Sequence, residues 1–107
     1  MKIQTADEEN FKNEKITRGL PTLIAVKVNT KADIRQVISK ILQIPYVENV
    51  YKVTGEIDVM VVVRTGSSFS LNNVIESIRA LPGVMETNSY LVLQEFKKEI
   101  ETQSKKF

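Results

Sequence analysis

An internal repeat restricts the possible folds of this chain more than any other feature. Ile24 lies 37 positions before Val61, and the same shift superposes Pro45 on Pro82. The shift also aligns further apolar residues, pairing Val26 with Val63, Ile34 with Leu71, Val37 with Val74, Ile38 with Ile75, Ile41 with Ile78, Ile44 with Leu81 and Val47 with Val84. The chain therefore contains two copies of one structural unit.

Each copy is predicted to form a strand, a helix and a second strand. The β-branched runs are typical of strands, and we expect strands at 23–28, 47–54, 57–64 and 84–93. Between them, apolar residues fall on one helical face: Ile34, Val37, Ile38, Ile41 and Leu42, then Leu71, Val74, Ile75 and Ile78. We expect Thr30 with Asp33 to begin the first helix, and Ser68 or Ser70 to cap the second.

Gly55 and Glu56 separate the second predicted strand from the third. A glycine at that position favours a two-residue type II′ turn, because φ must be positive there. Two strand-helix-strand units joined by this hairpin predict an α+β, ferredoxin-like βαββαβ fold with two helices on one face of a four-stranded antiparallel sheet. The chain of 107 residues suits one domain, expected at 21–98 between an N-terminal arm at 1–20 and a C-terminal tail at 99–107.

The composition excludes several functional classes. The absence of cysteine and histidine removes disulfides, thiolate metal sites, the commonest metal ligand and the usual general base. The net charge of +2 is interspersed along the chain, so nothing indicates a nucleic-acid surface. No run resembles a signal peptide or a membrane span. We expect a cytoplasmic protein that is not an enzyme and uses neither a metal nor a cofactor.

The helix-free face of the predicted sheet is unusually apolar. The hairpin register places Val53 opposite Asp58 and Tyr51 opposite Met60 on that face. The predicted set on the face is Leu23, Ala25, Tyr51, Val53, Met60 and Val62. A patch of this kind is larger than a soluble monomer usually exposes, so we predict a homodimer, or an assembly of dimers, packed sheet against sheet. In the alternative, one end of the chain covers the face.

Asp58 stands out in an otherwise apolar strand. Burying an unpaired carboxylate costs several kcal/mol, so this group must be solvated, paired or hydrogen-bonded. The structural interpretation is an acid at the strand entry that bonds the turn backbone or faces water. The functional interpretation is that the carboxylate receives the ammonium group of a ligand.

Three short motifs resemble a known family. Gly55 and Asp58 form a Gly-x-x-Asp turn, 81–84 reads Leu-Pro-Gly-Val, and Thr87 and Ser89 precede Tyr90 in the last strand. Together they resemble the effector-binding (RAM) module of the Lrp/AsnC transcription regulators over about 21–98. The family more often has threonine where this chain has Ser89.

The resemblance implies dimers that join their sheets, further assembly of those dimers, and free amino acids bound in clefts between them. It implies a ligand-binding role for Gly55, Asp58, Thr87, Ser89, Lys52, Ser68 and Tyr90. Asp58 would lie near the α-ammonium of the amino acid. The charges of Lys52 and Glu56 leave the identity of that amino acid open.

One departure from the family concerns DNA. Full-length regulators carry an N-terminal helix-turn-helix domain, whereas the segment 1–20 is too short for a three-helix DNA reader. The chain thus resembles a stand-alone module, and we expect no direct contact with nucleic acid. Its expected partners are an amino acid, other copies of itself and full-length Lrp/AsnC regulators.

Other functions remain as alternatives. One is a pure oligomerisation module, and another is an ACT-like regulatory domain, which shares the topology. An RNA-binding domain of this fold needs aromatic residues in its central strands, and the runs 23–28 and 58–63 contain none. A barrel enzyme needs a titratable base in a polar pocket, which a chain without histidine is poorly equipped to supply.

Overall fold

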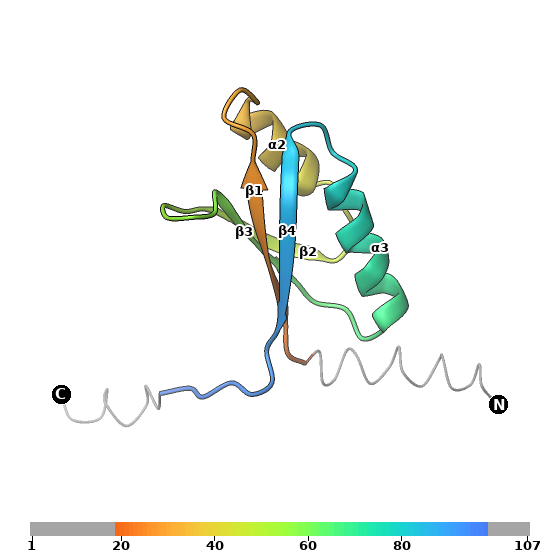
Figure 1. Ribbon diagram of the computed structural model, residues 1–107. Coiled ribbons are helices and arrows are strands. Elements are labelled where there is room, and N and C mark those ends of the chain that lie inside the picture. The colour runs from red at the N-terminus through yellow and green to blue at the C-terminus, as the bar shows by residue number, and fades with distance from the viewer. Residues whose placement is uncertain (1–18, 99–107) are drawn as a thin grey trace.

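The structure, a computed structural model, describes residues 19–98 (Figure 1). Its elements, in chain order, are β1 (Thr22–Val28), α2 (Ile34–Ile41), β2 (Val47–Lys52), β3 (Val59–Val63), α3 (Ser68–Arg79) and β4 (Val84–Leu91). Apart from Gly19 and Leu20, the predicted N-terminal arm lies outside the described residues, and so does the predicted C-terminal tail. The described residues include the whole of the predicted domain, 21–98, whose bounds stay a prediction.

The four strands form one sheet in the order β2-β3-β1-β4, and every neighbouring pair is antiparallel. Both helices lie on one side of this sheet, while the β2–β3 hairpin projects away on the other side (Figure 1). The predicted ferredoxin-like α+β fold is confirmed. We call the side without helices the open face.

The core lies between the sheet and the helices. Val59, Val61 and Val63 of β3 are all fully buried there, whereas the alternate residues of this strand are half-buried on the open face. The repeat is visible in the packing: Val37 and Val74 are 3% and 2% exposed, and their partners one helical turn on, Ile41 and Ile78, are both fully buried. Equivalent positions of the two units are thus buried in the same core.

The helix caps differ from the prediction. Asp33, not Thr30, caps α2, because its side chain accepts a hydrogen bond from Arg35 N at 3.1 Å. Ser67 caps α3 by accepting from Ser70 N at 3.1 Å. Both capping residues have extended backbone, as an N-cap requires. The prediction of Ser68 or Ser70 is wrong because the chain is already helical from Ser68 onward.

The hairpin keeps the predicted register but is longer than predicted. Tyr51 pairs with Met60, and Val53 N donates to Asp58 O at 3.0 Å. The flanking strands end at Lys52 and begin at Val59, short of the predicted bounds. Four residues, 54–57, therefore form the loop in place of a two-residue turn, with Gly55 at a φ of +125°. β4 likewise ends two residues earlier than predicted, at Leu91.

A left-handed residue follows each helix. Gly83 has a φ of +94°, and a Cβ at this position would lie 2.7 Å from the Cβ of Ala32, so any side chain here would force the neighbouring residues to shift. Tyr46, its equivalent 37 positions earlier, has a φ of +74° although it is not glycine. The same chain reversal is thus made with a glycine in one unit and with a strained tyrosine in the other.

Candidate ligand-binding site

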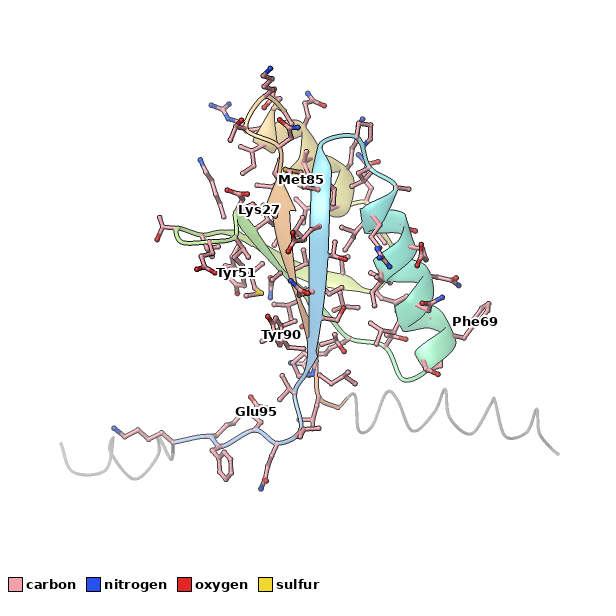
Figure 2. The ribbon with its side chains drawn as sticks, viewed as in Figure 1. Lys27, Tyr51, Phe69, Met85, Tyr90 and Glu95 are labelled. Carbon is pink, nitrogen blue, oxygen red and sulfur yellow. The ribbon has the colours of Figure 1, made fainter. Side chains whose placement is uncertain are left out.

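A cavity of about 420 Å³ lies where the end of β1, the β2–β3 hairpin and the start of β4 meet. Its lining consists of Lys27, Val28, Asn29, Thr30, Gly55, Glu56, Asp58 and Met85. In Figure 2, Lys27 lies beside the projecting hairpin and Met85 lies on the initial part of β4. The volume is within the range of small-ligand sites, about 300 to 1,000 Å³.

Asp58 is fixed in this cavity by three hydrogen bonds. Its backbone N donates to Val26 O at 3.0 Å, and its backbone O accepts from Val53 N at 3.0 Å. Its side-chain Oδ2 accepts from Val28 N at 2.8 Å. The carboxylate thus supplies an acceptor for the end of β1 at the point where β3 begins. The structural interpretation made from the sequence was right about a backbone bond, but the donor is in a neighbouring strand and not in the turn.

Lys27 brings a positive charge to the same cavity. It lies on the open face of β1, and its Nζ donates to the backbone carbonyl oxygen of Glu56 at 3.2 Å. The bond joins β1 to the hairpin loop, and a carbonyl partner leaves the full charge of the ammonium in place. The cavity therefore presents an ammonium group and carboxylates close together, as recognition of a zwitterion requires.

The other predicted ligand residues lie apart from this cavity in the single chain. Thr87 and Ser89 pair with Val26 and Ile24, so they are on the helix side of β4. Lys52 is on the helix side of β2, at the opposite edge of the sheet. Lys52 pairs with Val59, the residue after Asp58, so its side chain is separated from the cavity by the sheet itself and not by distance along it.

Tyr90 and Ser68 are also distant from Asp58. Tyr90 pairs with Leu23 on the open face of β4 and is 56% exposed. Ser68 lines a separate cavity of about 270 Å³ together with Thr22, at the other end of β1 from Asp58. The length of that strand puts roughly 20 Å between the two ends. Of the seven predicted ligand residues, only Gly55 and Asp58 line this cavity in the described part of a single chain.

The open face carries the residues predicted to form a dimer interface. Leu23, Val53, Met60 and Val62 are half-buried there. Tyr51 is 52% exposed, whereas Ala25, small and placed between Met60 and Asn88, is 4% exposed and adds little surface. The described C-terminal segment does not cover the face, since Leu93 and Phe96 are 88% and 83% exposed.

Sequence reasoning missed several lining residues of the cavity. Lys27, Thr30 and Met85 were not predicted to be near Asp58, because they come from β1, its following loop and β4. The position of Lys27 near Asp58 could have been predicted from the sequence. Lys27 is the only charged residue in 22–28, and strand alternation places it on the same face as Asp58.

A second cavity lies on the helix side. It has a volume of about 330 Å³ and is lined by Ile44, Pro45, Tyr46, Phe69, Ser70, Asn73, Val74 and Ser77. None of these residues is charged, so this cavity offers no side-chain ion pair to either charge of a free amino acid. Within 19–98, no group of three or more Asp or Glu residues could hold a metal ion, and no helix is long and apolar enough to cross a membrane.

The fold is that of a small α+β domain, and its charged cavity has the volume of a small-ligand site. The model of the Lrp/AsnC ligand binding domain matches residues 22–102, which is most of the chain. The chain therefore belongs to the Lrp/AsnC ligand-binding domain family, as its motifs predicted. The match also separates it from the ACT-like alternative.

The curated relatives include both regulators and an enzyme. The transcriptional regulator LysM of Sulfurisphaera tokodaii is 40% identical over 72 residues, which cover 67% of this chain and 51% of the regulator. A homocitrate synthase of Sulfolobus acidocaldarius is 37% identical over 76 residues, covering 71% of this chain and 16% of the enzyme. The chain thus spans about half the length of the regulator and a small part of the enzyme.

Solved structures share the fold. A hypothetical protein from Pyrococcus horikoshii is 28% identical, with a TM-score of 0.62 over 72% of this chain and 93% of that protein. A transcriptional regulator of Neisseria meningitidis, solved as an L-Met complex, is 24% identical, with a TM-score of 0.68 over 79% of this chain and 56% of the regulator.

Proposed function

We propose that this chain is a regulatory module that binds a free amino acid in the cavity around Asp58 and conveys its presence to a partner protein. The α-ammonium of the amino acid pairs with the carboxylate of Asp58, and the α-carboxylate pairs with Lys27. The module acts by binding and catalyses no reaction. Its family is defined by ligand binding, which supports this role.

One observation carries the proposal: the Asp58 carboxylate is held at 2.8 Å by Val28 N inside a cavity that also contains Lys27. A carboxylate oriented before the ligand arrives loses little freedom on binding, and this preorganisation favours affinity. Because Oδ2 receives the backbone bond, Oδ1 is the oxygen assigned to the ligand. The L-Met complex of the Neisseria regulator belongs to that protein, and here it serves only to select methionine as one of the probes.

The proposed module works as an assembly of chains. Pairing of two open faces buries Met60, Val62 and Tyr51, and so removes apolar surface from water. The hairpin that forms one wall of the cavity projects on the side of that face (Figure 1). A second pair of chains then brings residues such as Thr87 and Ser89 to the rim of the cavity.

Two kinds of partner suit the proposed module. Relatives that are regulators suggest that it joins full-length Lrp/AsnC regulators in mixed assemblies. The segment shared with homocitrate synthase suggests control of an enzyme. If the chain were only an oligomerisation module, it would form the same assemblies without responding to any amino acid.

A thermal-shift screen of the twenty amino acids with the full chain tests the proposal. A ligand that binds only the folded state at about 100 times its dissociation constant stabilises that state by about 2.7 kcal/mol. For a domain of this size, the melting temperature then rises by roughly 10 °C or more. If every amino acid left the melting temperature unchanged at millimolar concentration, the module would have no amino-acid site.

Calorimetry with Asp58→Asn assigns the site. Asparagine keeps a side-chain oxygen for Val28 N but removes the charge that attracts the ammonium group. We expect at least a tenfold loss of affinity, in line with the roughly 1.4 kcal/mol of a lost charge pair. Asp33→Asn is the matched control, because it makes the same change at the cap of α2, outside the cavity. If the two variants bound the amino acid with equal affinity, the ligand would not bind at Asp58.

A further inference from the structure

The charges of the cavity do not balance. Its lining contains two carboxylates, Glu56 and Asp58, and one ammonium group, Lys27. The ion pairs among the described residues join Arg64 to Glu48 and Arg79 to Glu76, so they do not involve the cavity. Lys27 donates to the backbone of Glu56 and not to its carboxylate. Within residues 19–98, the cavity therefore keeps a net charge of minus one.

A bound amino acid with a neutral side chain leaves this excess in place. Its ammonium and carboxylate groups neutralise Asp58 and Lys27, and the carboxylate of Glu56 then has no counter-charge. Glu56 is exposed in the single chain, so the cost arises when the ligand and a neighbouring chain cover its carboxylate and displace the water that solvates it. A second positive charge on the ligand removes that cost.

We propose that the cavity selects an amino acid with a cationic side chain, such as lysine or arginine, and that Glu56 determines this specificity. The inference rests on the proposed function and goes beyond it by naming the class of ligand. Glu56 lies in the hairpin loop, on the wall that also includes Gly55. The side-chain cation of the ligand pairs with its carboxylate.

The rest of the lining suits the stem of such a side chain. Met85 is 59% exposed at the start of β4 and offers a flexible apolar surface for methylene groups. Asn29 and Thr30 add uncharged polar groups and leave the charge unchanged. The cavity near Tyr46 and Phe69 lacks charged residues altogether, so it has no comparable preference.

The experiment compares L-lysine with L-norleucine, which has almost the same shape but no side-chain charge. Calorimetry on the full chain should show lysine binding at least about tenfold more tightly, since one additional charge pair contributes on the order of a tenfold change. L-methionine, another uncharged probe, should bind like norleucine. In Glu56→Gln, lysine affinity should fall by about tenfold while norleucine affinity stays within about twofold.

The control is Glu76→Gln, which removes an exposed glutamate on α3, away from the cavity. Lysine should bind this variant as it binds the natural chain. If norleucine binds as tightly as lysine, or if Glu56→Gln leaves their ratio unchanged, the proposed specificity is wrong while amino-acid binding stands. If neither compound nor any other amino acid binds, the proposed function itself fails, and the specificity fails with it.

Discussion

The carboxylate of Asp58 is bonded to the backbone N–H of Val28, thirty positions earlier in the chain, with 2.8 Å between Oδ2 and N. A single side chain thus closes the end of the β1–β3 pairing and shapes the cavity assigned to the ligand. Two roles in one residue complicate mutagenesis. A variant that loses the bond changes both stability and binding.

The first prediction separates these two roles. Asp58→Ala leaves Val28 N without its acceptor and should lower the free energy of unfolding by about 1 to 3 kcal/mol. Asp58→Asn keeps an oxygen at the same position and should cost less than about 1 kcal/mol. Urea denaturation of the two variants measures the difference. If both variants lost the same stability, the charge and not the hydrogen bond would account for the effect of Asp58.

The second prediction concerns the open face. Met60→Lys places a charge in the middle of the proposed interface and should convert dimers into monomers, because pairing would bury that charge. In the single chain the long lysine stem can lie along the sheet with its ammonium in water, so the fold persists. Light scattering measures the change in mass.

Phe69→Lys is the control for this experiment, since Phe69 is 76% exposed on α3, on the other side of the sheet (Figure 2). Its mass should equal that of the natural chain. If the natural chain is already monomeric at micromolar concentration, the proposed pairing of open faces is wrong.

The third prediction compares two glycines. Gly83→Ala should destabilise the fold more than Gly55→Ala. Both positions have positive φ, but an added Cβ meets Ala32 at 2.7 Å only at Gly83, and nothing lies within 4 Å of it at Gly55. Backbone strain costs about 1 to 3 kcal/mol in either variant, and the clash adds to it at Gly83. Chemical denaturation should rank them in this order, and the reverse ranking would show that Ala32 moves aside freely.

The fourth prediction follows from the strained backbone of Tyr46. At a φ of +74°, glycine is favoured over alanine by about 1 kcal/mol. Tyr46→Gly should therefore be more stable than Tyr46→Ala by about that amount, although both lose the same aromatic contacts. Thermal unfolding of the pair checks this. Equal stability would mean that the reversal after α2 can be made with negative φ.

Much of the fold could be predicted because it depends on local patterns. The 37-residue repeat and the alternation of Val59, Val61 and Val63 indicated the strands, the helices and the buried face. The hairpin register followed from Gly55 alone. The N-caps were predicted at the wrong residues because several nearby hydroxyl and carboxyl groups could cap each helix. The residue that caps is the one with extended backbone just before the first helical residue.

The site was harder to predict than the fold. Its walls come from segments distant in sequence, so the bond between Asp58 and Val28 and the bond between Lys27 and Glu56 leave no local pattern. Family motifs indicated Gly55 and Asp58, which the chain does bring together. They also indicated Ser68, Thr87 and Ser89, which lie elsewhere in the single chain. The proposed assembly accounts for Thr87 and Ser89 but not for Ser68.

The most direct test of the central claim is an NMR titration of the ¹⁵N-labelled full chain with L-lysine. The amides of Val28 and Gly55 should show the largest saturable shifts, because one is bonded to the Asp58 carboxylate and the other lines the same cavity. Asp58→Asn should weaken that response. Saturable shifts confined to Tyr46 and Phe69, around the uncharged cavity on the helix side, would contradict the account.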